Sequence, residues 1–279
     1  MNSNIIIPAD VPTHEDQEFL SNYQAITSLN GRLFLFAADQ KIEHLNQDFY
    51  GKDIHEDVQK PDHLFDIASQ GTIGAFATHL GLISRYGTQF PEINYVAKLN
   101  AKTNLLDQDP LSEQLWSVKE VIKLKEQSGL KIRAIGFTIF LGSEHEHKML
   151  HHAAHAIFEA HQHGLVTILW SYVRGKTIKN DQDPQILAGA AGVANALGAD
   201  FVKIKPPQNP QDLKIAVAAA GNTKVICSGQ KRTESQQFLQ TLQEQLNAGA
   251  SGCATGRNIF QHSTHEAITM TKEIAKIIQ

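Results

Sequence analysis

The sequence predicts an α/β protein with the fold of a TIM (β/α)8 barrel. Its 279 residues suit one large domain, and barrels of this kind commonly have this length. Short apolar runs alternate with segments of helical periodicity, and several runs are apolar at every position, as in parallel strands buried on both faces. Eight such runs favour a closed barrel, with an open doubly wound sheet as the alternative. The predicted strands cover residues 33–38, 72–76, 95–99, 134–140, 166–170, 201–205, 224–227 and 252–255.

Helical patterns occupy most of the intervals between these strands. Gly164, Gly198 and Gly249 directly follow three of the patterns, at the position where glycine commonly ends a helix. These glycines therefore support the predicted helix ends. The patterns cover residues 111–127, 148–163, 184–197, 233–248 and 265–278.

The first strand is preceded by an N-terminal helical extension over about residues 1–30. A helix is expected over 14–29, with Thr13 and Asp16 as a capping box. No linker rich in Pro, Gly or Ser interrupts the chain, so one barrel domain is expected to span 1–279.

Composition excludes several classes of partner. The net charge is −4, from 25 Lys and Arg against 29 Asp and Glu, so neither nucleic acid nor an anionic membrane is expected as a partner. The two cysteines, Cys227 and Cys253, argue against a disulfide framework and for a reducing compartment. The N-terminus does not resemble a signal peptide, and no run approaches the ~18 apolar residues that span a membrane. We therefore expect a cytoplasmic protein.

A lysine inside a predicted buried strand is the first sign of chemistry. Lys203 lies in the apolar run 199–205, and Lys205 shares its face because side chains alternate along a strand. Burial and a nearby like charge both lower the pKa of a lysine, and a neutral amine can attack a carbonyl to form a Schiff base. The alternative is that both lysines extend from a strand end to water.

Other reactive side chains follow predicted strands at the carboxyl edge, where barrel active sites lie. The first strand ends at Asp39, and the fifth leads into Trp170 and Tyr172. Tyr172 could exchange a proton with a substrate hydroxyl or with the carbon beside an iminium, and Asp39 could accept a hydroxyl proton or position the lysine. Alternatively, the aromatic side chains pack inside the barrel and Asp39 caps the next segment.

The seventh and eighth strands end in small-residue turns, Ser228-Gly229 and Gly256-Arg257. Such turns bind phosphate through backbone N–H groups and a helix N-terminus, and the loops after these two strands are the usual phosphate site of the fold. Either dipeptide alone more often marks a plain turn. Together, at these strand ends, they predict a phosphorylated substrate.

These motifs resemble those of the archaeal-type (DhnA-type) class I fructose-bisphosphate aldolases, within the superfamily of Schiff-base aldolases. The resemblance extends from about residue 33 to 278. Trp170 and Tyr172 precede Lys203 by 33 and 31 residues, and this spacing makes the combination more specific than any single motif. The segments that carry the resemblance are Ala-Ala-Asp at 37–39, Trp-Ser-Tyr at 170–172, Arg-Gly at 174–175, Val-Lys-Ile-Lys at 202–205, Ser-Gly at 228–229 and Gly-Arg-Asn at 256–258.

The resemblance implies a role for each residue. Lys203 would be the Schiff-base lysine, Tyr172 the acid and base for proton transfer, Trp170 a residue that shapes the site, and Asp39 the partner of substrate hydroxyls. A substrate phosphate would be bound by Ser228, Gly229, Gly256 and Arg257, and Lys41, Lys98, Arg174 and Lys231 are available for a second one.

The implied reaction is the reversible cleavage of fructose 1,6-bisphosphate to dihydroxyacetone phosphate and glyceraldehyde 3-phosphate. It would need no metal and no cofactor. The partners implied are the sugar phosphate and further copies of the chain, because members of the family often assemble as rings, commonly decamers.

The chain departs from the family pattern at three places. Gln40-Lys41 replaces a common His-Gly pair, and Gly229-Gln230 replaces Gly-Gly. The polar stretch 39–63 is longer than an ordinary loop, and is either a flap over the barrel mouth or a surface elaboration. These differences concern the substrate more than the Schiff-base chemistry.

Three other functions compete with this interpretation. The first is a related Schiff-base enzyme, either an aminodideoxyheptulosonate synthase or a thiolase acting on a phosphorylated dione. The second is a zinc enzyme, because the segment 145–163 is rich in histidine and places His151 and His155 one helical turn apart; an exposed histidine-rich helix is the simpler explanation. The third, a non-catalytic scaffold, is disfavoured because Lys203, Tyr172 and Asp39 are all present.

Overall fold

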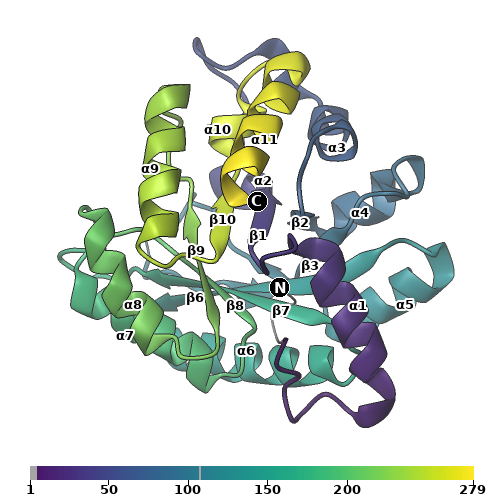
Figure 1. The fold of residues 1–279 in the computed structure, drawn as a ribbon, viewed down its shortest axis with the longest axis vertical. Coiled ribbons are helices and arrows are strands. Elements are labelled where there is room, and N and C mark those ends of the chain that lie inside the picture. Colours follow the sequence, from purple (N-terminus) through teal and green to yellow (C-terminus); the bar gives the residue numbers. More distant parts are fainter. Residues whose placement is uncertain (1–4, 107) are drawn as a thin grey trace.

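The computed structural model describes residues 5–106 and 108–279, so the first four residues of the predicted N-terminal extension lie outside the described part. Eight parallel strands close into a barrel with helices around it, which confirms the predicted fold class (Figure 1). Neighbouring strands of the barrel also follow one another along the chain. The barrel strands are β1 (Leu33–Ala37), β2 (Ala75–His79), β3 (Tyr95–Lys98), β6 (Ile132–Leu141), β7 (Val166–Val173), β8 (Phe201–Ile204), β9 (Lys224–Ser228) and β10 (Gly252–Thr255), and a separate pair is formed by β4 (Asn100–Ala101) and β5 (Glu113–Gln114).

The second strand lies later in the chain than the sequence predicts. The predicted range was 72–76, whereas β2 spans Ala75–His79. Gly74 passes so close to the end of the first helix that a Cβ there would lie 2.1 Å from the Ile26 carbonyl oxygen. Its N–H donates to the Phe34 carbonyl oxygen at 2.9 Å. Residues 72–74 therefore form the approach to the strand, and β2 begins only after the contact of Gly74 with Ile26 and Phe34.

Two further strand ends affect the site. β7 continues past the predicted end at residue 170 and so includes Tyr172. β8 ends at Ile204, one residue earlier than predicted, which leaves Lys205 beyond the strand. The prediction that Lys203 and Lys205 share one face assumed that both lie in the strand. Lys205 lies beyond its end, so strand alternation does not fix the direction of its side chain.

The helices confirm the predicted alternation, with one large displacement. α5 begins at Val118 rather than 111, because β4 and β5 pair first and Ser117 then caps the helix in a capping box. Gly164, Gly198 and Gly249 have φ of +62°, +86° and +105°, as predicted for glycines that end helices. The helices are α1 (Asp16–Ile26), α2 (Gln40–His44), α3 (Pro61–Gln70), α4 (Leu80–Tyr86), α5 (Val118–Ser128), α6 (Glu146–His161), α7 (Pro184–Ala196), α8 (Leu213–Ala219), α9 (Ser235–Asn247), α10 (Arg257–Phe260) and α11 (Thr264–Ile278).

The predicted capping box at the first helix is wrong. Thr13 lies inside a short 3-10 turn, Thr13–Glu15, that runs directly into α1. Because the turn already continues into the helix, the N-cap position falls on Glu15, and no side chain makes a capping hydrogen bond there.

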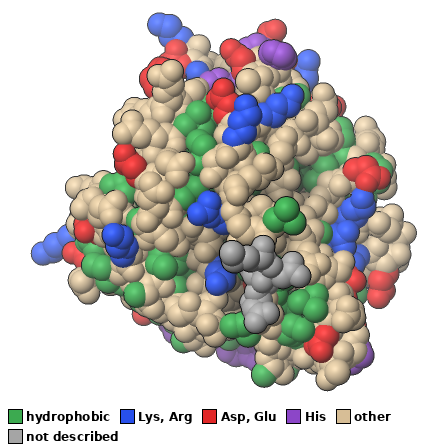
Figure 2. Space-filling view, in the orientation of Figure 1, with side chains coloured by type: hydrophobic (Ala, Val, Ile, Leu, Met, Phe, Trp, Pro, Cys, Tyr) green, Lys and Arg blue, Asp and Glu red, His purple; other side chains and the backbone are tan. Residues whose placement is uncertain are grey.

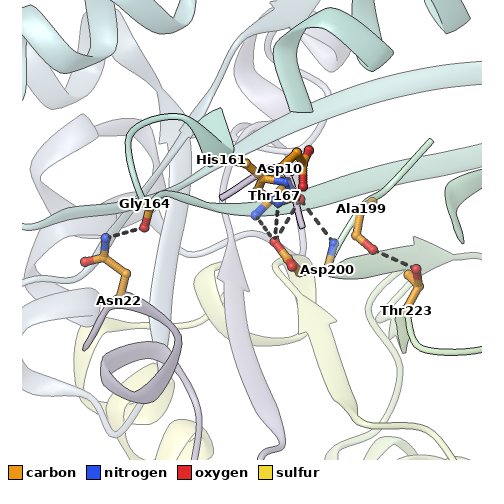
Figure 3. Close-up of polar contacts among 8 residues, drawn as sticks. All are labelled: Asp10, Asn22, His161, Gly164, Thr167, Ala199, Asp200 and Thr223. Carbon is orange, nitrogen blue, oxygen red and sulfur yellow. Dashed lines mark hydrogen bonds and ion pairs between the residues drawn. The ribbon is translucent and has the colours of Figure 1, made fainter. Parts of the chain in front are cut away.

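A polar network connects the N-terminal segment to the amino ends of the strands (Figure 3). The buried His161 ring bonds Asp10 through Nδ1 at 2.9 Å and Asp200 through Nε2 at 3.1 Å. The same Asp200 carboxylate accepts the backbone N–H and the hydroxyl of Thr167, at 2.8 and 2.9 Å. Each member has its partners, as buried polar groups require. The network thus connects the chain before α1 to the end of α6 and the starts of β7 and β8.

The face of the molecule shown in Figure 2 has no field of one sign. On the face shown in Figure 2, acidic and basic side chains are interspersed. None of the helices within the described ranges is long and apolar enough to cross a membrane.

Candidate active site

A cavity of about 740 Å³ opens at the carboxyl ends of the barrel strands. Its volume lies in the range typical of small-molecule sites, and its position is that of active sites in this fold. Ten of the residues that the sequence analysis singled out line this one cavity. They are Asp39, Trp170, Tyr172, Arg174, Lys203, Ser228, Gly229, Lys231, Gly256 and Arg257.

Lys203 projects into the cavity from β8, the sixth strand of the barrel. Its side chain is only 4% exposed, and its Nζ lies 5.1 Å from the centroid of the Trp170 ring. Burial lowers the pKa of Lys203 and the charge of Arg257 lowers it further, whereas Asp39 opposes the shift. No acceptor in the described part of the chain bonds the Nζ. The amine therefore faces the cavity without a hydrogen-bond partner from the chain.

The predicted role of Lys205 as the neighbouring like charge is wrong. Its Nζ donates to both carboxylate oxygens of Asp181 at 2.7 Å, at the rim of the cavity. The strand has already ended, so the side chain reaches the rim and an acidic partner neutralises it. Arg257, on another element, is a positive charge that does lower the pKa of Lys203.

Trp170 and Tyr172 project from β7 on the same side as Lys203. Trp170 pairs with Lys203 in the strand register, and its buried Nε1 lacks a hydrogen-bond partner among the described residues. Gly136 on the adjacent strand makes room for the indole, since a Cβ there would lie 2.5 Å from the ring. The Tyr172 ring stacks on Phe140 with centroids 6.4 Å apart. The two aromatic residues thus line the cavity rather than only filling the barrel.

Tyr172 retains its phenolic proton. Burial raises the pKa of Tyr172 well above its ordinary value, and the carboxylates of Asp39 and Glu43 raise it further. A phenol in this state holds a proton that it can donate to a strongly basic carbon, and the phenolate that it leaves is a strong base.

Asp39 follows β1 and occupies the N-cap position of α2. Its side chain makes no capping hydrogen bond there, so the alternative that Asp39 only caps the next segment is wrong. Its carbonyl oxygen is fixed by His79 Nε2 at 3.0 Å. The carboxylate therefore remains available to the cavity.

The turns after β9 and β10 are fastened to each other. The Asn258 amide donates to the Gly229 carbonyl oxygen at 2.6 Å and accepts from the Thr233 N–H at 2.9 Å. A Cβ at Gly229 would lie 2.2 Å from the Thr255 hydroxyl, so only glycine fits at that position. Asn258 was part of a predicted motif, but its bracing role depends on the distance between two strands and is not visible in sequence.

The Gly229 N–H already donates to the Ala254 carbonyl oxygen at 3.1 Å. This amide is therefore engaged within the barrel, unlike the exposed amide that the sequence analysis expected. The next residue, Gln230, has φ of +54°, a left-handed conformation that favours glycine. The geometry explains why the related pattern has glycine here, and Gln230 holds that conformation at a cost of about 1 kcal/mol or more.

Two arginines at the mouth are each placed beside a carboxylate. Arg257 lies 3.5 Å from Asp48, a distance at the limit of a hydrogen bond, whereas Arg174 contacts Glu43 at 2.8 Å. Asp48 and Glu43 both belong to the stretch 39–63. That stretch therefore borders the cavity mouth beside the predicted phosphate residues.

Lys98 is the residue that sequence reasoning left unplaced. It was available in principle for a far phosphate, but the structure buries it inside the barrel at 2% exposure, outside the cavity lining. The signal was present, because Lys98 interrupts the apolar run 95–99 as Lys203 interrupts its own.

The histidine-rich helix α6 does not form a metal centre with the residues described. His151 and His155 stack with ring centroids 4.5 Å apart on an exposed face. Nowhere in residues 5–106 or 108–279 do three His, Cys, Asp or Glu side chains gather so as to hold a metal ion. The structure thus gives no support to the zinc alternative.

Comparison with known proteins agrees with this site. The family model described as DeoC/LacD family aldolase matches residues 33–262 of this chain. A protein of Methanocaldococcus jannaschii named fructose-bisphosphate aldolase/6-deoxy-5-ketofructose 1-phosphate synthase is 50% identical over 98% of this chain and 90% of its own length. The structure of a fructose-bisphosphate aldolase from Slackia heliotrinireducens superimposes with a TM-score of 0.96, at 44% identity over 99% of this chain and 90% of that one.

A third protein connects the fold to a reaction intermediate. An archaeal fructose-1,6-bisphosphate aldolase, solved with its catalytic lysine covalently bound to the carbinolamine intermediate of the substrate, has a TM-score of 0.83. It is 30% identical over 93% of this chain and 99% of its own. On sequence and on structure together, the chain belongs to the DeoC/LacD family of aldolases.

Proposed function

We propose that this protein is a class I fructose-bisphosphate aldolase, an aldehyde-lyase that works through a Schiff base. The observation that carries the proposal is the amine of Lys203, buried and without a partner from the chain, in a cavity of about 740 Å³. A lysine in this state is a nucleophile for ketones. The family membership and the named relatives support the choice of fructose 1,6-bisphosphate as the ketone.

The nucleophilic attack and the proton transfers of this reaction can each be assigned to a residue of the cavity. Lys203 attacks the C2 ketone, and loss of water from the carbinolamine gives an iminium. Asp39 takes the proton of the C4 hydroxyl, so that the C3–C4 bond breaks and its electrons move into the iminium to give an enamine. Glyceraldehyde 3-phosphate leaves, and Tyr172 donates a proton to C3. Hydrolysis of the new iminium releases dihydroxyacetone phosphate and regenerates the amine, and the proton that Asp39 took from the C4 hydroxyl returns to the Tyr172 phenolate.

The phosphate groups would be held at the mouth. Arg257 directly follows Gly256 in the turn after β10, and it would bind one phosphate together with Ser228 and Gly256. Arg174 and Lys231 would bind the phosphate at the other end of the sugar. No metal or cofactor has a role in this scheme, because the iminium accepts the electrons of the broken bond.

A second activity is favoured by the Methanocaldococcus jannaschii relative, whose name includes a 1-phosphate product. The enamine on Lys203 would then add to an aldehyde that carries no phosphate. The difference from the first activity lies at the far phosphate site, so Arg174 and Lys231 would matter for cleavage of the bisphosphate and less for this addition.

We also propose that the enzyme acts in the cytoplasm, in glycolysis and gluconeogenesis, as a homo-oligomeric ring. The support is the resemblance to the ring-forming aldolases. The two free, buried cysteines suit a reducing compartment. Light scattering coupled to size exclusion would measure the mass directly, and a monomer would contradict the ring.

The experiment for the proposed function combines turnover with trapping. Cleavage of fructose 1,6-bisphosphate should survive EDTA, and dihydroxyacetone phosphate with borohydride should add one adduct to the intact mass. Activity lost to EDTA and restored by zinc, with no adduct, would replace Schiff-base chemistry by metal chemistry.

A further inference from the structure

The mechanism above leaves one buried cation without a role. Lys98 ends β3, inside the barrel, and its Nζ lies 5.3 Å from the centroid of the Trp170 ring. Lys203 Nζ lies 5.1 Å from the same centroid. Two buried lysines thus share one indole, a contact that favours cations in a desolvated site.

The Lys98 side chain is clamped rather than free. Its Nζ donates to the Asn100 carbonyl oxygen at 2.9 Å and to the Asn100 side-chain oxygen at 2.8 Å. Asn100 is itself fixed, because its amide donates to Thr138 O at 2.7 Å and to Ser112 O at 3.0 Å. The ammonium therefore has a defined position and defined acceptors.

The strand register places Trp170 between the two lysines. Lys98 pairs with Gly136, which pairs with Ile168, whereas Lys203 pairs with Trp170. Trp170 lies on β7, one strand from Lys203 on β8 and two strands from Lys98 on β3, and its indole contacts both ammonium groups. Lys98 does not line the cavity, so it is not placed to touch the substrate.

The titratable groups around Lys98 and Lys203 come from several elements of the barrel. Asp39 after β1 and Glu43 on α2 favour the charged form of both lysines, and Arg257 on α10 disfavours the charged form of Lys203. His79 at the end of β2 adds no charge, because burial and the Lys98 ammonium lower its pKa to about 4. Cys253 on β10 also faces Lys203, but burial raises the pKa of its thiol, which stays neutral.

We infer that Lys98 is a positioning residue whose buried ammonium, held by Asn100 and by the indole it shares with Lys203, disfavours the protonated form of Lys203 at neutral pH. The inference rests on the proposed function, since it assumes that Lys203 is the nucleophile. It assigns to Lys98 the like-charge effect that the sequence analysis gave to Lys205.

The pH range of the effect follows from the state of Lys98. Burial, first, and the charge of Lys203 lower the pKa of Lys98 to about 8. Below that pH Lys98 is charged and repels a proton on Lys203; above it Lys98 becomes neutral and the repulsion disappears. A side chain that only filled space beside Trp170 would have no such pH dependence.

The test is the rate of borohydride trapping with limiting dihydroxyacetone phosphate, measured against pH for the wild type and for Lys98→Met. The variant should trap about tenfold more slowly at about pH 6–7, and the two rates should converge above about pH 8–9. An equal ratio at every pH would overturn the inference. Lys131→Met, the same substitution beside Glu92 at the opposite end of the barrel, should follow the wild type throughout.

A second measurement does not depend on the folding of Lys98→Met. In protein labelled with ¹³C at lysine Cε, NMR should show Lys98 titrating near its pKa of about 8, and Lys203→Met should move that titration upward, because coupling between two sites is reciprocal. An unchanged Lys98 titration would overturn the inference. A wild type that forms no adduct would instead contradict the proposed function, while this titration would still report whether the two lysines interact.

Discussion

The two ends of the barrel treat buried polar groups in opposite ways. At the amino ends of the strands, both ring nitrogens of His161 are bonded, and the ring is fully buried. At the carboxyl ends, Trp170 Nε1 is buried without a partner in the described chain, and no hydrogen bond contributes to the pKa of Lys203, whose side chain also lines the cavity. Satisfied networks stabilise a fold, whereas unsatisfied groups at a cavity are available to a ligand. The difference separates the residues that hold the barrel together from those that act on substrate.

Backbone conformation follows the same division. Among the described residues, the non-glycine positions with positive φ are Leu45 and Gln230, at +55° and +54°. Gln230 lines the cavity, and Leu45 follows α2 beside its mouth. Strain of this kind concentrates at functional sites, where the surrounding structure maintains it.

The largest effect should come from the carboxyl end. Tyr172→Phe removes the phenolic proton and keeps the ring on Phe140, so kcat should fall by about 10²–10⁴-fold while the borohydride adduct still forms. The unfolding midpoint should not change. An unaltered kcat would mean that another group protonates the enamine, and a lost adduct would mean that Tyr172 is needed earlier, when the iminium forms.

The matching substitution at the amino end should reverse this pattern. His161→Ala leaves Asp10 and Asp200 without the ring between them, and breaking a buried pair costs about 3–5 kcal/mol of unfolding free energy. Denaturant titration should show this loss, with kcat of the folded enzyme unchanged. A fall in kcat without a loss of stability would contradict the division between the two ends.

The pH dependence of that stability can be given a sign. Burial alone would lower the pKa of His161, but hydrogen bonds and charges from Asp200 and Asp10 outweigh burial and raise it. The protonated histidine therefore stabilises the fold fully below its ordinary value of 6.5, and this contribution is lost as the pH rises through the raised value. The stability difference between the wild type and His161→Gln should shrink from acid to alkaline pH. A difference that grows would contradict the assignment.

The smallest of these effects concerns phosphate. Arg257→Ala should raise KM for fructose 1,6-bisphosphate by about 10–100-fold, because a charge-assisted contact of about 1.5–3 kcal/mol is lost. Arg32→Ala, which removes an arginine from the opposite end, is the control and should leave KM unchanged. An unchanged KM for Arg257→Ala would show that the phosphate is held by other residues.

The sequence predicted the barrel because alternating apolar runs and helical patterns are local properties. It also predicted which strand ends carry reactive side chains, since each of these residues follows its own strand. Register is not local: Lys98 and Lys203 interrupt similar apolar runs, and only the pairing of β3 through β8 brings both beside the indole of Trp170.

Besides register, the exact ends of the strands were not predictable from the sequence. The expected pairing of Lys203 with Lys205 required one more residue of strand than β8 has, and the partner of Lys205, Asp181, comes from a different loop. The bracing of Gly229 by Asn258 likewise depends on contact between two turns far apart in sequence. Contacts between segments, rather than the segments themselves, were what sequence reasoning could not supply.

The central claim is that Lys203, and not the other buried lysine beside Trp170, is the nucleophile. Reduction with borohydride in the presence of dihydroxyacetone phosphate, followed by proteolysis and mass spectrometry, locates the modified lysine directly. We expect the adduct on Lys203 alone, and none in Lys203→Ala. An adduct on Lys98 or Lys205, or one that persists in Lys203→Ala, would contradict the account.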